Sequence, residues 1–177
     1  MHEKQDEETV AGLLQSCRLQ VDRCENASGK APDFRVSAPG GELFFCEVKS
    51  TRATAQWSAY STIFSNITGD VHDAVKQFSA VNSLHLVPNV LVWVPHVPWF
   101  NRSTFIDLVG GGVFVEDTPH ADLRKYRQGR FDGDFRHIDL FLWVYHWGAP
   151  DMVFNAANLD HARKLARLLA DLRSQPR

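Results

Sequence analysis

The stretch Lys30–Ser50, KAPDFRVSAPGGELFFCEVKS, places charged residues beside two short apolar runs. Asp33 opens the first run, DFRVS, and Glu47 and Lys49 lie near the end of the second, LFFCEVKS. The letters PGG at 39–41 stand between the runs and favour a tight turn. The stretch therefore predicts two antiparallel strands joined as a hairpin.

The charges of the second run point to one side of the predicted strand. Side chains alternate along a strand, so Phe45, Glu47 and Lys49 share a face. A carboxylate beside an apolar run costs stability unless it is paired, hydrogen-bonded or bound to a metal. For Glu47 and Lys49 alone, an ion pair at an edge strand or a solvated strand end is the simplest interpretation.

The length of the loop decides whether Asp33 joins this group. A two-residue loop would set Asp33 opposite Val48, on the other face, whereas a three-residue loop at 39–41 sets it opposite Glu47. Proline suits the first position of such a loop, and glycine suits its left-handed position. We therefore predict an odd loop, or an equivalent bulge, that brings the carboxylates of Asp33 and Glu47 within reach of a single ion.

The combination of PDF at 32–34 with FFCEVKS at 44–50 resembles the signature of the PD-(D/E)xK nuclease superfamily, the restriction-endonuclease-like phosphodiesterases. The resemblance implies a Mg²⁺-dependent nuclease, with Mn²⁺ as the alternative metal and DNA preferred to RNA as the substrate. It implies that Asp33, Glu47 and the Val48 carbonyl bind the metal. It also implies that Lys49 orients or polarises the attacking water.

The implied chemistry suits these residue types. Phosphodiester cleavage requires a neutralised phosphate and an activated water, and a hard divalent ion supplies both. Mg²⁺ prefers a few carboxylate oxygens together with waters and substrate phosphate. Asp33 and Glu47 provide such oxygens when they are ionised.

Two further positions match accessory residues of that superfamily. Glu7 lies at the edge of the apolar stripe of the first predicted helix, with Glu3, Asp6 and Glu8 as competitors. A solvated acidic first turn is the alternative interpretation of all four. Gln77 borders the apolar face of the helix that follows the ExK strand, where a partly exposed glutamine is the alternative.

Hydrophobic periodicity predicts the remaining elements. Asp70 is expected to be the N-cap of the second helix. The order predicts one domain over residues 1–177, of α/β or α+β class, with a central mixed β-sheet flanked by helices. The resemblance makes this fold restriction-endonuclease-like. The predicted helices lie at about 3–15, 68–81, 102–112 and 159–175, and the strands within 17–25, 33–37, 43–50, 89–97, 113–117, 138–147 and 152–156.

The charge distribution limits the mode of nucleic-acid binding. A net charge of −2 and a pI near 6.4 argue against a strongly basic protein that coats nucleic acid. The last predicted helix carries a local basic group, Arg163, Lys164 and Arg167, which we assign as candidate phosphate contacts. A solvated helix surface is the equal alternative. The modest charge favours a protein partner or a homodimer for substrate delivery.

Other features of the chain predict structure rather than chemistry. No apolar run approaches the roughly 18 residues of a membrane span, so we expect a soluble, cytoplasmic protein. The three cysteines form no CxxC pair and are expected to be reduced and mostly buried. The pairs His120/Asp122 and His137/Asp139 are interpreted as structural.

Two rival interpretations remain at this point. A non-catalytic module could retain the nuclease fold and bind nucleic acid or a protein, but it would not need Asp33, Glu47 and Lys49 together. A soluble α/β protein with an accidental ion pair is the third interpretation. The pattern leaves open DNA versus RNA, endonuclease versus exonuclease, and the target sequence.

Overall fold

A computed structural model describes most of the chain and contains a single mixed sheet among the described strands. The described residues are 2–25, 30–41, 43–51, 60–97, 100–110, 130–155 and 157–173. The six strands follow one another across the sheet in chain order. They are β1 (Gln20–Arg23), β2 (Phe34–Ser37), β3 (Leu43–Thr51), β4 (Asn89–Pro95), β5 (Leu140–Trp143) and β6 (Asp151–Phe154).

The direction of the strands changes across the sheet. Strands β1, β2 and β3 form an antiparallel meander, β3, β4 and β5 run parallel, and β6 returns antiparallel to β5. Strand β4 is buried along its whole length, as its continuous apolar run predicts for a strand covered on both faces. The α/β class and the central mixed sheet are thus confirmed.

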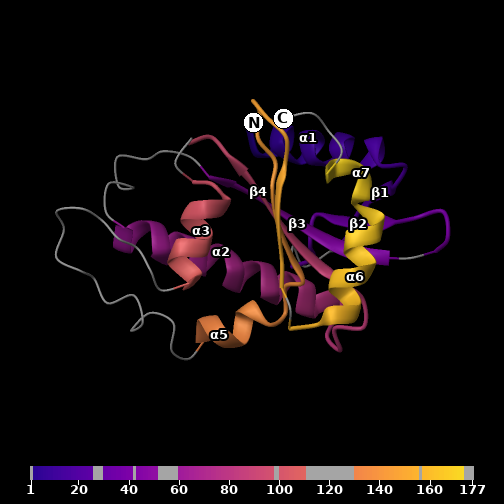
Figure 1. Cartoon of the computed structure of the whole chain (residues 1–177). Helices are drawn as coiled ribbons and strands as arrows, with labels where there is room; N and C mark the ends of the chain where they lie inside the picture. Colours follow the sequence, from indigo (N-terminus) through magenta and orange to yellow (C-terminus); the bar gives the residue numbers. More distant parts are fainter. Residues whose placement is uncertain are drawn as a thin grey trace.

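Helices cover both faces of this sheet (Figure 1). Helices α1, α6 and α7 lie on one side and α2, α3 and α5 on the other. Their bounds are α1 (His2–Ser16), α2 (Tyr60–Val81), α3 (Arg102–Gly110), α5 (Arg130–Phe135), α6 (Leu159–Leu168) and α7 (Ala170–Arg173). None of these described helices combines the length and apolar character that crossing a membrane requires.

Two apolar layers hold the helices to the sheet. On the α1 side, Cys46 and Val48 of β3 pack in one buried cluster with Val10 and Leu14. On the α2 side, Trp93 packs in the cluster that includes Phe45, Val71 and Phe78. Each such side chain contributes about 1.5 to 3 kcal/mol when fully buried. The alternation of β3 therefore directs its even-numbered residues towards α1 and its odd-numbered residues towards α2.

The hairpin between β2 and β3 has the predicted odd register. Phe34 pairs with Cys46 and Ser37 with Leu43, so Asp33 is level with Glu47. The N–H of Gly41 donates to the Ala38 carbonyl at 2.9 Å, and Gly41 has a positive φ of 80°. Glycine adopts this left-handed conformation at little cost. The predicted loop geometry is confirmed.

The second helix differs from the prediction because it starts at Tyr60 rather than near residue 68. The Thr68 hydroxyl donates to the Ser65 carbonyl at 2.9 Å, so this side chain is satisfied within the helix and does not begin it. Asp70 does not cap a helix, contrary to the prediction. It lies inside α2 and accepts a hydrogen bond from Trp93 Nε1 at 3.2 Å.

The C-terminal helix is divided into α6 and α7 at Leu169, whose φ of −106° and ψ of 19° leave the helical region. Asn158 caps α6, because its side chain accepts from the His161 N–H.

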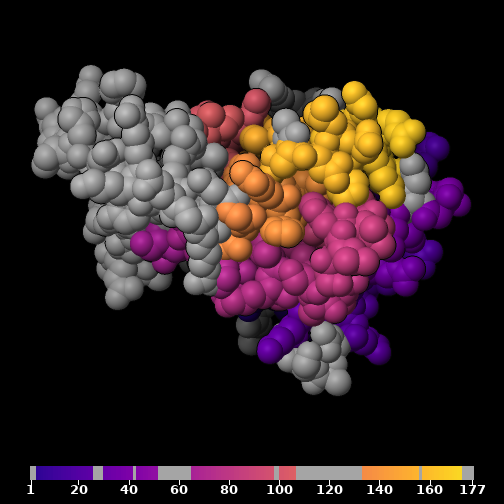
Figure 2. Space-filling view, turned by 90° about the horizontal axis from the view of Figure 1, so that it is seen from below, coloured from indigo at the N-terminus to yellow at the C-terminus, as the bar shows by residue number. Residues whose placement is uncertain are grey.

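Figure 2 shows α6, in yellow, beside the segment that follows α2. His161 and His85 of these two segments both contact Asp139. Asp139 therefore takes its imidazole partners from distant segments rather than from the nearby His137.

Cys17 and Cys46 are buried, Cys24 is half-buried, and all three are free thiols, as predicted. The predicted strand 113–117 and the pair His120/Asp122 lie outside the described residues.

Candidate active site

The carboxylates of Asp33 and Glu47 meet at the end of the hairpin. The Asp33 N–H donates to Glu47 Oε2 at 3.2 Å, and the Val48 N–H donates to Asp33 Oδ2 at 2.7 Å. Each carboxylate is thus held by the main chain of the opposite strand. The two acids predicted to share one face do so, and Val48 lies directly against them.

Lys49 joins this pair from the next position on the same face of β3. Its Nζ lies 2.7 Å from Glu47 Oε1 and 3.4 Å from Gln77 Oε1. Gln77 reaches the site from α2, and its Nε2 donates to the Ala31 carbonyl at 3.4 Å. The structure therefore brings together Asp33, Glu47, Lys49 and Gln77, four of the predicted catalytic residues.

Burial gives the two acids unusual proton affinities. The Glu47 side chain is 2% exposed, and burial together with the neighbouring Asp33 charge raises its pKa to about 7, although Lys49 and Gln77 oppose the shift. Burial also raises the pKa of Asp33, and the charge of Glu7 adds to the effect, while the Val48 N–H opposes it. Close acids with raised pKa values are common at functional sites.

Lys49 stays charged in this setting. Burial alone would lower its pKa, but the Glu47 carboxylate outweighs that effect, and Asp70 and Asp33 add to it, so the pKa is raised. An ammonium ion therefore stands beside the carboxyl pair near neutral pH.

Asp70 is a member of this site that the sequence interpretation misses. The negative charge of Asp70 helps to raise the pKa of Lys49. Burial raises the pKa of Asp70 itself to about 6, although the Trp93 hydrogen bond and the charge of Lys49 oppose this shift. Asp70 and Gln77 are two helical turns apart on α2, a spacing that places both on one side of the helix. That spacing is the available signal, but the turn-like residues before Asp70 favour an N-cap.

The first helix contributes two acids with different partners. Glu7 forms an ion pair with Arg23 at 2.6 Å, and its charge acts on Asp33. Asp6 instead accepts a hydrogen bond from the Ser50 hydroxyl at 2.5 Å. The other two competitors are exposed. Among the four acids, Glu7 is the one whose charge bears on Asp33.

The basic group of α6 lies apart from these residues. Helix α6 packs with the cluster that contains Val48, on the sheet face opposite to Glu47 and Lys49. Lys164 Nζ donates to the Leu43 carbonyl at 3.2 Å, at the far end of β3, and Arg163 lies 3.4 Å from Asp160. Arg163, Lys164 and Arg167 are therefore not brought together with the carboxyl pair.

Comparison with known protein families, characterised proteins and solved structures finds no match for this chain. A function therefore has to be inferred from the chemistry of the residues themselves.

The donor set fits a hard divalent ion. Carboxylate and carbonyl oxygens are the ligands that Mg²⁺ selects, and no imidazole of the described residues contacts Asp33 or Glu47. Asp33, which directly precedes β2, lies level with Glu47 of β3, so their oxygens can face a single ion. Asp33 and Glu47 would hold the metal, with the Val48 carbonyl as the further oxygen implied by the motif.

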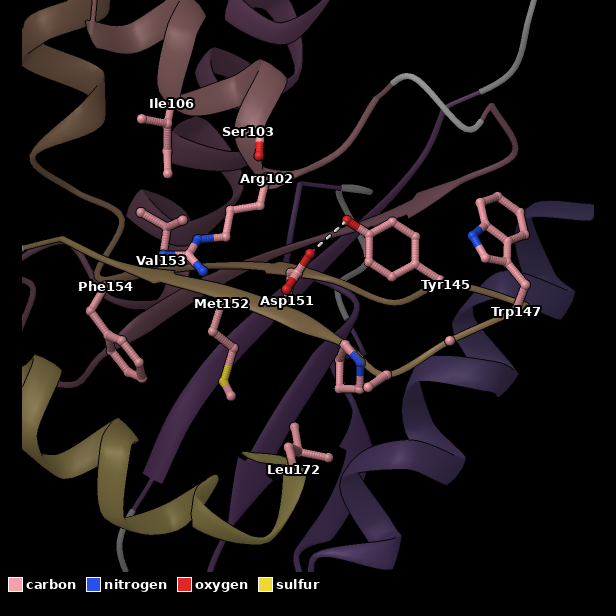
Figure 3. Close-up of a pocket in the computed structure, with 13 residues that line it drawn as sticks. Arg102, Ser103, Ile106, Tyr145, Trp147, Asp151, Met152, Val153, Phe154 and Leu172 are labelled. Carbon is pink, nitrogen blue, oxygen red and sulfur yellow. Dashed lines mark hydrogen bonds between the residues drawn. The ribbon is translucent and has the colours of Figure 1, made fainter. Parts of the chain in front are cut away.

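A pocket of about 1140 Å³ lies elsewhere, between α3 and the β5–β6 hairpin (Figure 3). Arg102, Tyr145 and Trp147 line it, and the Tyr145 hydroxyl donates to Asp151 at 3.2 Å. None of the predicted site residues lines this pocket. Its size alone gives it no chemistry comparable to that of the carboxyl pair.

Proposed function

We propose that this protein is a Mg²⁺-dependent phosphodiesterase with a restriction-endonuclease-like fold, and that it cleaves DNA. The observation that supports the proposal most strongly is the register of the β2–β3 hairpin. It sets Asp33 level with Glu47, on the face from which Lys49 projects. Two carboxylates and an ammonium ion in this arrangement match the requirements of phosphodiester hydrolysis.

The acids are not arranged as a simple stabilising ion pair. Lys49 lowers the pKa of Glu47, as in any ion pair, but burial and the neighbouring Asp33 outweigh it and raise that pKa to about 7. The cause is burial beside a second acid, which a pair made only for stability would avoid. The arrangement costs stability and is therefore better explained by function than by accident.

Each residue of the site would have a separate role in the proposed hydrolysis. A bound Mg²⁺ neutralises phosphate charge and activates water. Asp33 and Glu47 would hold the ion, and the Val48 N–H, which donates to Asp33, fixes the orientation of that carboxylate. Lys49 presents a charged donor to water or phosphate, and Glu47 and Gln77 position it.

Cleavage of circular DNA tests this proposal. We expect the protein to nick or linearise double-stranded or single-stranded circles with Mg²⁺ or Mn²⁺, and to leave them intact in excess chelator. A parallel RNA substrate separates DNA from RNA specificity. Binding without cleavage at any metal concentration would favour the non-catalytic module that retains this fold.

The salt dependence of DNA binding tests the basic group of α6. Each phosphate of duplex DNA that the protein neutralises contributes about 0.9 to the slope of log affinity against log salt concentration. Replacing Arg163, Lys164 and Arg167 together by neutral residues should flatten the slope by that amount for each phosphate they neutralise. Because α6 lies on the face opposite to Glu47, the duplex would have to extend around the sheet. An unchanged slope would make these side chains an ordinary solvated surface.

A further inference from the structure

A group of side chains of the types that ligate metals lies where α1 meets the ends of β4 and β5. Asp6 comes from the first turns of α1, His96 directly follows β4, and His146 follows β5. Strands β4 and β5 are parallel neighbours, so the segments that follow their carboxyl ends leave the sheet at the same end. Residues far apart in the chain are thereby brought to one point.

We propose that Asp6, His96 and His146 bind a transition-metal ion of the zinc class. His96 Nε2 lies 2.8 Å from Asp6 Oδ2, and His146 Nε2 lies 3.6 Å from Asp6 Oδ1. The ligand atoms of all three residues lie within 4.8 Å of one another. Ligand atoms around a tetrahedral zinc ion, with bonds of about 2.0 to 2.1 Å, lie about 3.3 Å apart. The observed separations fall on either side of that value.

The surroundings of the carboxylate are those of a metal ligand. The Asp6 side chain is 2% exposed, and the Ser50 hydroxyl donates to its Oδ2, the oxygen that also faces His96, which fixes the orientation of the carboxylate. Hydrogen bonds of this kind orient ligating carboxylates and raise metal affinity. His96 and His146 are 30% and 36% exposed, so an ion can enter from solvent. Three protein ligands with an open side leave a position for water or another small ligand.

The ligand types separate this site from the Asp33–Glu47 pair. Two imidazoles and one carboxylate favour zinc and its neighbours over Mg²⁺, which prefers oxygen ligands. Ser50 follows Lys49, and alternation along β3 directs these two side chains to opposite faces of the sheet. The inference is therefore independent of the proposed nuclease activity.

The second histidine group of the chain provides a control. Asp139 lies 2.7 Å from His85 Nε2 and 3.1 Å from His161 Nδ1, and it also accepts from the Asn89 N–H at 2.8 Å. Both imidazoles are largely buried. The three ligand atoms of this group also lie within 4.8 Å of one another, but its imidazoles are less open to solvent than His96 and His146. The group joins α6 to the segment after α2 and serves as the comparison of similar composition.

Co²⁺ binding, followed by visible absorption, tests the proposal. We expect one ion with an imidazole-type spectrum, bound by the wild type and displaced by Zn²⁺. The variants His96→Gln and His146→Gln keep a side-chain amide near Asp6 but lose the ring nitrogen. Residues that only orient a ligand contribute roughly 10- to 100-fold to metal affinity, so losing a ligand should weaken binding about 100-fold or more. The control variant His161→Gln should bind as the wild type does.

Trp147 supplies an independent measurement. Its ring lies 6.5 Å from that of His146 and is exposed. Bound Co²⁺ should quench its fluorescence, and Trp147→Phe should remove most of the quenching while the Co²⁺ absorption remains. Unchanged affinity in both His96→Gln and His146→Gln would overturn the proposal, and so would loss of the spectrum in His161→Gln alone.

Discussion

Replacing Glu47 by Gln should reduce Mg²⁺-dependent DNA cleavage to background, and replacing Lys49 by Met should reduce it about 10²- to 10³-fold, the usual effect of removing one positioned hydrogen-bond donor from an active site. Glutamine keeps the size of Glu47 but removes the charge that would bind the ion. Methionine keeps the aliphatic part of Lys49 and removes the ammonium that lies 2.7 Å from Glu47. Single-turnover cleavage of a labelled duplex measures both effects.

The matched control for Lys49→Met is Lys76→Met on α2. Lys76 is exposed and pairs only with Asp73 of its own helix, at 2.9 Å, among the described residues. This variant should retain wild-type cleavage, and circular dichroism should show that all three variants are folded. Cleavage that survives in Glu47→Gln or Lys49→Met, or that continues in chelator, would show that these residues do not have the proposed roles.

The hairpin can be predicted in detail because all its determinants are local. The proline and glycines at 39–41 select the loop, the loop selects the register, and the register decides which face Asp33 shares. Gln77 is placed correctly for a similar reason, because the helical stripe around it is regular. These inferences need only neighbouring residues in the chain.

The start of α2 and the place of Asp70 cannot be obtained in this way. Thr68, Gly69 and Asp70 resemble a helix start, but tertiary contacts decide otherwise. The indole of Trp93 on β4 donates a hydrogen bond to half-buried Asp70, and Lys49 supplies a compensating charge. Local preferences are weak compared with burial of a long apolar face, so the helix continues through these residues.

The group of Asp6, His96 and His146 also lies beyond local patterns. Its assembly depends on β4 and β5 being parallel neighbours and on α1 lying against their ends. The only sign of this group in the sequence is that each of three strands has a polar residue at or after its end. These residues are Ser50, His96 and His146. Such residues are ordinary at strand ends until the strand order is known.

The same Glu47→Gln variant should be more stable than the wild type above neutral pH. The pKa of Glu47 is about 7 in the folded protein and 4.5 when the residue is unperturbed. Between these values the unfolded chain has released a proton that the folded chain still holds, so the stability of the wild type falls as the pH rises. Each pKa unit corresponds to about 1.4 kcal/mol, and the loss approaches roughly 3 kcal/mol at pH 7 and above.

Glutamine removes this dependence, because it is neutral throughout. The advantage of Glu47→Gln over the wild type, measured by urea unfolding, should therefore grow by roughly 3 kcal/mol between about pH 4.5 and pH 8. The same substitution at exposed Glu8 is the control and should leave the pH profile unchanged. Saturating Mg²⁺ should restore stability to the wild type at the upper end of this range, since an ion between Asp33 and Glu47 offsets their repulsion, and should have no such effect on Glu47→Gln. The opposite result would be a free energy of unfolding that rises with pH in the wild type relative to Glu47→Gln. It would mean that the Lys49 ion pair affects the pKa of Glu47 more than burial does, and that the site stabilises the fold rather than binding a cation.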